Sequence, residues 1–110
     1  MNPTEDLLAI HLTELGLHFE RQYAYAKGRK LRADFATWGG HDYRDSYRLC
    51  LIEVQGGIYT RQAHGSVTGV LKDNERLFEA FKAGWHMIRV TPQQVESGEA
   101  KAMIEEVLRR

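Results

Sequence analysis

The sequence of 110 residues contains a single cysteine, only two prolines and no net charge, because 15 basic residues balance 15 acidic ones. A lone cysteine, Cys50, cannot form a disulfide within the chain, which suits a reducing compartment. No apolar run approaches the roughly 20 residues that span a bilayer. The opening stretch, MNPTEDLLAI, lacks the basic segment and apolar centre of a signal peptide. These absences predict a cytoplasmic protein that does not enter a membrane.

The length and composition are those of an ordinary globular domain. A chain of 110 residues falls within the usual size of one domain, and 43% hydrophobic with 27% charged residues argues against disorder. No internal repeat, low-complexity segment or linker divides it, so we expect a single domain over residues 1–110. A nucleic-acid-binding protein is usually more basic than this one. Residues 20–48 nevertheless hold a local excess of basic residues that could meet phosphates.

Hydrophobic periodicity and turn residues predict the order of the elements. The order is one helix, three strands, a second helix, a fourth strand and C-terminal helices, with the first six elements over residues 3–16, 18–26, 31–38, 48–54, 69–83 and 85–91. Thr91, Pro92 and Gln94 predict a capping box at the start of the C-terminal helices. This order predicts an α/β fold with a central mixed four-stranded sheet flanked by helices.

The strand over residues 48–54 ends in polar groups. Its sequence, RLCLIEV, is almost continuously apolar, so we expect it near the centre of the sheet, covered on both faces. Strand alternation places Glu53 and Gln55 on one face with Leu51. A buried carboxylate needs a cation, a metal or hydrogen-bond donors. If the preceding strand pairs with this one, Asp34 meets Glu53 at one edge, and two carboxylates there suit Mg²⁺ or Mn²⁺.

At these residues the chain resembles the PD-(D/E)xK nuclease superfamily. Asp34 in RADF, followed by Glu53, Val54 and Gln55 on an apolar strand, is similar to the acidic signature of that superfamily. The segments LRADFA, IEVQGG, AHGSVTG, KDNERL and GWHMIRVTPQQVESGEA together resemble small phage and bacterial endonuclease-like proteins, relatives of Holliday junction resolvases and very short patch repair endonucleases. The resemblance covers most of residues 5–100. It implies a restriction endonuclease-like fold and Mg²⁺-dependent hydrolysis of DNA, with Mn²⁺ able to substitute.

The resemblance also implies roles for individual residues. Asp34 and Glu53 would hold the metal, and Glu5 on the first helix would complete the site. Gln55 stands where the signature usually has lysine, whose charge stabilises the phosphate or positions the attacking water. Glutamine can hydrogen-bond water but carries no charge. This is the main departure from the family pattern.

Other residues could supply the missing cation or contact DNA. Lys72 and Arg76 lie four residues apart, on one face of the helix that follows the signature, and either could provide the positive charge. His64 matches a histidine that would contact phosphate or transfer a proton. Arg32 and Arg61 would contact the nucleic acid.

Each of these residues also has an ordinary structural explanation. Glu5 could cap the first helix with Asn2, and Asp34 could form a salt bridge with Arg32 or Arg48. The remaining alternatives are a capping role for Gln55, a solvated helix face for Lys72 and Arg76, a surface position for His64, and a core position for Trp38, Trp85, Phe78 and Phe81.

Two classes of function remain open. The first is an endonuclease with structure-selective or weakly specific cutting, acting in DNA repair, recombination or phage DNA processing, with a homodimer implied by the likeness to junction resolvases. The second is a catalytically inactive nucleic-acid-binding module that keeps the nuclease fold, an alternative favoured by the absent lysine. No organic cofactor is implied by either hypothesis.

Overall fold

The order of helices and strands is the one predicted from the hydrophobic pattern. The computed structural model describes residues 2–38, 49–55 and 67–108. Its elements are α1 (Pro3–Glu14), β1 (His18–Ala24), β2 (Arg32–Trp38), β3 (Leu49–Val54), α3 (Val67–Lys82), β4 (His86–Val90), α4 (Pro92–Ser97) and α5 (Glu99–Leu108). In the described part of the chain, no helix is both long and apolar enough to cross a bilayer.

The four strands form one mixed sheet in the order β1-β2-β3-β4. The β1–β2 and β2–β3 pairs are antiparallel, whereas β3 and β4 run parallel and are connected across the sheet through α3. A parallel pair needs such a crossover connection, usually a helix. The predicted α/β fold with a mixed four-stranded sheet is therefore confirmed, and the apolar β3 occupies an inner position as expected.

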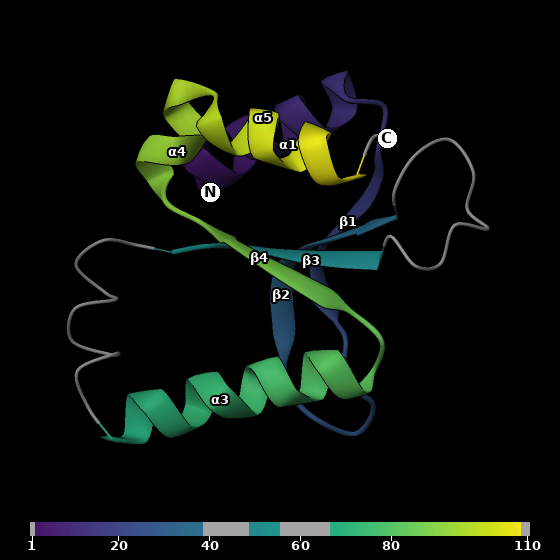
Figure 1. Cartoon of the computed structure of the whole chain (residues 1–110), viewed down its shortest axis with the longest axis vertical. Coiled ribbons are helices and arrows are strands. Elements are labelled where there is room, and N and C mark those ends of the chain that lie inside the picture. Colours follow the sequence, from purple (N-terminus) through teal and green to yellow (C-terminus); the bar gives the residue numbers. More distant parts are fainter. Residues whose placement is uncertain (1, 39–48, 56–66, 109–110) are drawn as a thin grey trace.

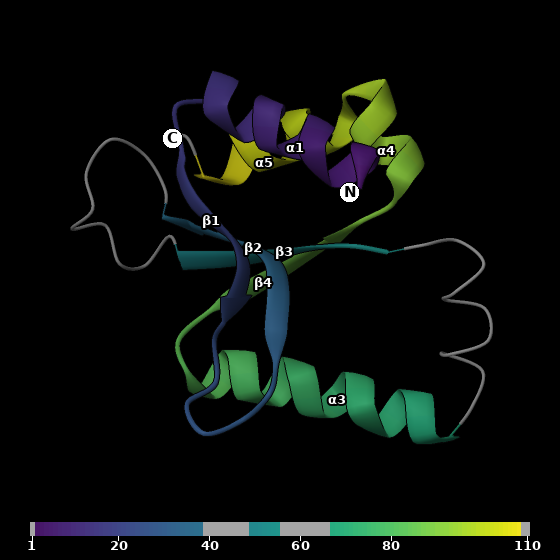
Figure 2. The same ribbon diagram turned by 180° about the vertical axis from the view of Figure 1, so that it is seen from behind.

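Helices cover both faces of the sheet (Figures 1 and 2). α1, α4 and α5 lie together on one side, and α3 lies alone on the other. β3 alternates between the two sides: Cys50 and Ile52 pack into a large core with α1, α4 and α5, while Leu51 packs into a smaller core. We call these the large core and the small core. The alternation predicted for β3 is thus confirmed, and it turns Glu53 toward the side of α3.

Capping side chains fix where α1 and α4 begin. The Asn2 side chain accepts a hydrogen bond from the Glu5 backbone N–H at 3.1 Å, and Pro3 occupies the first turn of α1. At α4 the Thr91 hydroxyl accepts from the Gln94 N–H at 3.2 Å, and the Gln94 side chain accepts from the Thr91 N–H at 3.0 Å. The predicted capping box is confirmed. The Asn2 cap places Glu5 in the first turn of α1.

The expectation that four aromatic residues lie in the core is only partly correct. Trp38 and Trp85 are half-buried against the small core, with ring centroids 5.7 Å apart. Phe78 and Phe81 instead lie on the outer side of α3, where 61% and 81% of their surfaces are exposed. The prediction was wrong for these two residues because α3 turns its charged side, not its apolar side, toward the sheet.

Candidate functional site

Asp34 and Glu53 come together at one end of the sheet. The β2–β3 register pairs Phe35 with Ile52, so one further step sets Asp34 opposite Glu53, where the backbone ladder ends. The Asp34 carboxylate replaces a ladder bond, because its Oδ2 accepts the Val54 N–H at 2.8 Å. Both carboxylates predicted from the sequence therefore lie where β2 and β3 separate.

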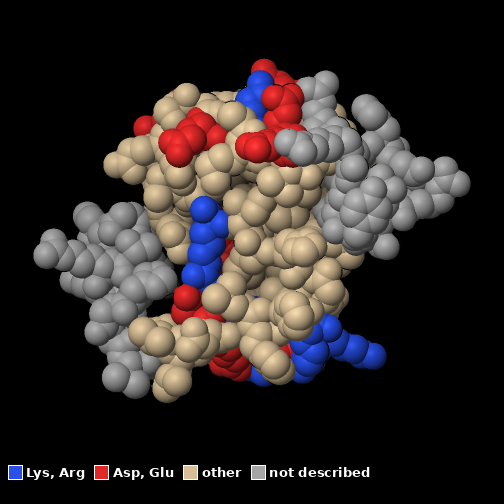
Figure 3. Space-filling view, viewed as in Figure 1, with Lys and Arg blue, Asp and Glu red and all other residues tan. Residues whose placement is uncertain are grey.

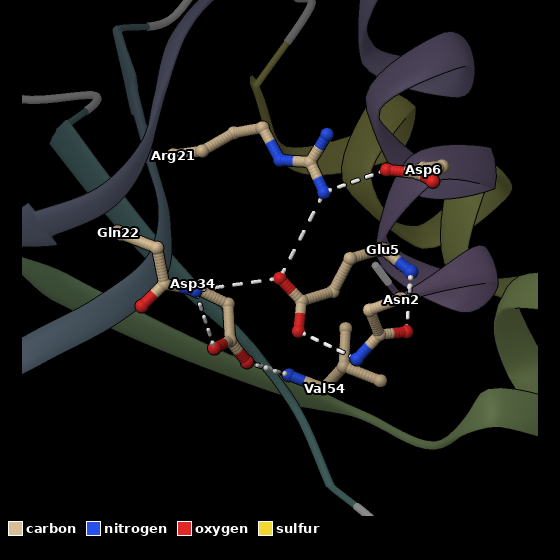
Figure 4. A network of polar contacts seen from close by, with 7 residues as sticks. All are labelled: Asn2, Glu5, Asp6, Arg21, Gln22, Asp34 and Val54. Carbon is tan, nitrogen blue, oxygen red and sulfur yellow. Dashed lines mark hydrogen bonds and ion pairs between the residues drawn. The ribbon is translucent and has the colours of Figure 1, made fainter.

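Glu5 joins this end of the sheet from the first turn of α1 (Figure 4). The Gln22 amide Nε2 lies 3.4 Å from Glu5 Oε1 and 3.4 Å from Asp34 Oδ1, so it points between the two carboxylates. Burial and the nearby charge of Asp34 raise the pKa of Glu5, while Arg21 and the Gln22 hydrogen bond oppose the rise. Asn2 Nδ2 also donates to Glu5 Oε2 at 2.8 Å. The Glu5 side chain thus contacts the helix cap and the Gln22 amide together.

Gln22 was not identified from the sequence. It has a backbone φ of +50°, the only positive φ at a residue other than glycine in the described part of the chain. Such a conformation is sparsely populated for a side chain of this size and often marks a constrained site. Arg32 Nη1 holds it by donating to the Gln22 carbonyl oxygen at 3.0 Å. The β1–β2 hairpin is symmetric about Gly28, and counting six residues from that turn would have placed Gln22 opposite Asp34.

Arg76 places a positive charge against Glu53, in addition to the charge of Arg21 near Glu5. Its guanidinium forms an ion pair with the Glu53 carboxylate and donates to the Arg32 carbonyl oxygen at 2.8 Å. Burial works to lower the pKa of Arg76, but hydrogen bonding to Glu53 and the negative charge of Glu53 outweigh it and raise the pKa, with a smaller contribution from Asp34. The partner that Glu53 was expected to require is therefore Arg76. The guanidinium also lies 5.9 Å from the centre of the Tyr25 ring.

Of the remaining predicted site residues, the structure describes Lys72 and Gln55 but not the two between them. Lys72 is exposed to solvent, whereas Arg76, four residues later in the same helix, is half-buried and pairs with Glu53. Gln55 directly follows β3, and its backbone N–H donates to the Val90 carbonyl oxygen at 2.7 Å, which extends the β3–β4 pairing. Arg61 and His64 lie outside the described residues, as does Arg48.

The ligand types at this end of the sheet fit a hard divalent cation. Glu5, Asp34 and Glu53 offer carboxylate oxygens, which Mg²⁺ and Mn²⁺ prefer. Within the described ranges, however, no three histidine, cysteine, aspartate or glutamate side chains converge around one metal-binding position. The oxygens of Glu53 and Asp34 are engaged by Arg76, by Gln22 and by the Val54 N–H. The carboxylates are chemically suited to a divalent metal, but the Arg76 guanidinium and the Gln22 amide already contact them.

Comparisons of the chain with protein-family models, with curated proteins and with solved structures found no match. A functional argument therefore depends on the residues of the site and on their geometry.

Proposed function

We propose that this chain is a divalent-metal-dependent DNA endonuclease of the PD-(D/E)xK type. The observation that carries the proposal is the meeting of Asp34 and Glu53 at the end of two paired strands, with Glu5 beside Asp34 and the guanidinium of Arg76 against Glu53. Two neighbouring carboxylates at a strand end could bind a divalent metal, and a cation beside them could stabilise the negative charge on a scissile phosphate.

Asp34, Glu53 and Glu5 would hold Mg²⁺, or Mn²⁺ in its place. When bound, such an ion lowers the pKa of a water molecule and polarises a phosphoryl oxygen. Metal binding would compete with Arg76 for Glu53 and with the Gln22 amide for Asp34 and Glu5. Burial first and the charge of Asp34 second raise the pKa of Glu5, and the second of these is a negative charge that would attract a cation.

Arg76 would supply the charge that the signature normally takes from lysine. A guanidinium released from Glu53 presents several donors in a fixed geometry that matches phosphate oxygens. Such donors stabilise the negative charge that develops during phosphodiester hydrolysis. Gln55 would orient water by hydrogen bonding, and the exposed Lys72 would contact the DNA backbone at longer range.

The DNA would approach the sheet end that carries these carboxylates. The described surface seen in Figure 3 is mostly uncharged; acidic side chains lie over the layer of α4 and α5 and also near α3, where basic side chains accompany them. An acidic layer repels phosphates. With little room for a recognition domain, cutting would be structure-selective or weakly specific, in DNA repair, recombination or phage DNA processing. A reducing cytoplasm suits a chain with one cysteine. Burial raises the pKa of the Cys50 thiol to about 12, which makes this thiol unreactive.

The alternative is an inactive nucleic-acid-binding module with the same fold. The ion pair between Arg76 and Glu53 favours it, because the guanidinium already neutralises one of the two central carboxylates. With glutamine at position 55 as well, the site would then contain a structural ion pair and no catalytic metal.

DNA cleavage separates the two functions. Purified protein is incubated with supercoiled plasmid and with branched DNA in Mg²⁺, Mn²⁺ or EDTA, beside the Asp34→Asn and Glu53→Gln variants. Glu14→Gln is the matched control, since Glu14 is an exposed carboxylate that pairs with Lys101 away from the site. We expect metal-dependent cutting by the wild type and by the control, and none by the two site variants. Gln55→Lys should preserve or raise the activity.

Other outcomes of this experiment would contradict the proposal. Binding of DNA without cutting in any metal would leave the inactive module as the function. Absence of both binding and cutting would refute a role in nucleic-acid chemistry. Full activity of Glu53→Gln would show that the metal site has been assigned to the wrong residues.

A further inference from the structure

Helix α3 exposes its apolar side to solvent. Seven large hydrophobic side chains are exposed among the described residues, and five of them belong to this helix. Their exposed fractions are 44% for Val70, 63% for Leu71, 42% for Leu77, 61% for Phe78 and 81% for Phe81. We call these five residues the outer face of α3. A concentrated apolar surface of this kind usually marks an interaction site.

The opposite side of α3 is charged and is fixed to the sheet by ion pairs. Asp73 accepts a hydrogen bond from Arg89 Nη1 at 2.8 Å, and Arg76 pairs with Glu53. Over residues 69–82, the only hydrophobic side chain of α3 that is buried is Ala80. Rotating the helix to bury its outer face would break these pairs and leave charges partly buried without partners, which is strongly destabilising. The orientation of α3 therefore keeps the apolar side outward.

The outer face is large enough for a symmetric dimer. A large apolar side chain has a surface of about 150–250 Å². Multiplied by the five exposed fractions, this gives roughly 500 Å² of exposed apolar surface on the outer face. Two copies placed face to face would bury about 1,000 Å², the lower limit for a specific interface. Such an area suits a dimer that dissociates on dilution.

The pattern along α3 matches a second copy of the same helix. Val70, Asn74, Leu77 and Phe81 follow the alternating spacing of four and three residues that lines a coiled-coil seam. Asn74 is the polar residue in this exposed row, and its amide both donates and accepts hydrogen bonds. On a two-fold axis the same residue meets itself, so a self-complementary amide fits that position.

We propose that two copies of this chain associate through the outer faces of α3, packed antiparallel with Asn74 near the two-fold axis. In that register Leu71 lies opposite Leu77 of the partner subunit, and Val70 lies opposite Phe78 of the partner subunit. The charged side chains among the exposed residues of α3 are Lys72 and Lys82. Lys72 points away from the outer face, whereas Lys82 flanks it. Antiparallel packing separates Lys82 from its copy, whereas parallel packing sets the two Lys82 charges near each other. The inference goes beyond the nuclease proposal and does not rest on it.

Sedimentation velocity over a wide concentration range tests the association. We expect a monomer–dimer equilibrium for the wild type, and Phe78→Glu or Phe81→Glu should each weaken dimerisation by about 30-fold or more, as loss of an aromatic anchor does. Ile10→Glu is the matched control, because Ile10 is 55% exposed but belongs to α1. Circular dichroism verifies that each variant is folded. A wild type that stays monomeric, assembly beyond a dimer, or dimerisation unaffected by both phenylalanine variants would overturn the proposal.

Cysteine cross-linking tests the direction of packing. Under oxidation Asn74→Cys should form a disulfide-linked dimer, while Lys82→Cys should not, since position 82 lies about 12 Å along the helix from the axis. Cys50 is 1% exposed and contributes no background reaction. Cross-linking through position 82 would contradict antiparallel packing. Asp34→Asn should dimerise like the wild type, which keeps a failure of this proposal distinguishable from a failure of the nuclease proposal.

Discussion

Replacing Asp34 by asparagine or by alanine separates the structural contribution of this carboxylate from its proposed role as a metal ligand. Its Oδ2 accepts the half-buried Val54 N–H at 2.8 Å, and its Oδ1 lies 3.4 Å from the Gln22 amide. Asparagine keeps an oxygen acceptor for the Val54 N–H. Because a charged hydrogen bond becomes a neutral one, we expect the free energy of unfolding to fall by about 1 kcal/mol. Alanine leaves the Val54 N–H without its acceptor, and we expect a loss of about 1–3 kcal/mol.

Thermal unfolding and carboxylate titration by NMR measure both consequences. Each kcal/mol corresponds to roughly 4 °C in Tm for a domain of this size, so alanine should lower the Tm visibly further than asparagine does. Both substitutions remove the negative charge beside Glu5, and the pKa of Glu5 should fall toward its ordinary value. Equal Tm values for the two variants would refute the structural contribution of the Val54 hydrogen bond. An unchanged pKa of Glu5 would show that the two carboxylates are not neighbours.

Three further substitutions examine the same end of the sheet. A raised pKa means that native Glu5 holds its proton more tightly than unfolded Glu5, so its ionisation lowers stability as pH rises above about 4.5. Glu5→Gln should therefore unfold at higher urea than the wild type near pH 7 and at similar urea in acid; identical pH profiles would contradict this. Arg76→Met leaves the partly buried Glu53 without its cation and should cost about 2 kcal/mol in urea unfolding, a loss that adding Glu53→Gln should reduce. An unaltered midpoint for Arg76→Met would show that the ion pair contributes nothing. Tyr25→Phe removes a buried hydroxyl that has no hydrogen-bond partner among the described residues. The free energy of unfolding should therefore stay the same or increase by up to about 1 kcal/mol, and the Tm should stay the same or rise. A clear fall in Tm would reveal a partner for that hydroxyl.

The fold could be predicted from the sequence because its strongest signals are local. The apolar run of β3 indicated an inner strand, and the Thr91 and Gln94 capping box marked the start of α4. The meeting of Asp34 and Glu53 followed from strand alternation and from antiparallel pairing, which are also simple rules. These features depend on residues close in sequence or on one pairing between neighbouring strands.

The features that sequence reasoning missed depend on an unusual backbone conformation or on contacts between distant elements. The position of Gln22 between two carboxylates depends on the β1–β2 register and on a left-handed backbone conformation at Gln22. Nothing in the amino-acid sequence indicates that conformation at a glutamine. The amphipathic pattern of α3 showed which side is apolar but not which side faces the sheet. That choice is made by Arg89 and Glu53, which lie on β4 and β3 and pair with the charged side of the helix. Because the sequence does not show this orientation, it predicts a core position for Phe78 and Phe81.

Paramagnetic broadening by Mn²⁺ in NMR spectra tests most directly whether the carboxylates at the end of the sheet bind a divalent metal. Substoichiometric Mn²⁺ should broaden the backbone amide signals of Glu5, Gln22, Asp34 and Val54 first, because these residues surround the proposed metal ligands. Excess Mg²⁺ should restore the signals, and Asp34→Asn should abolish the effect. Broadening centred on another part of the chain, or none at all in the wild type, would contradict a metal-dependent nuclease site at this position.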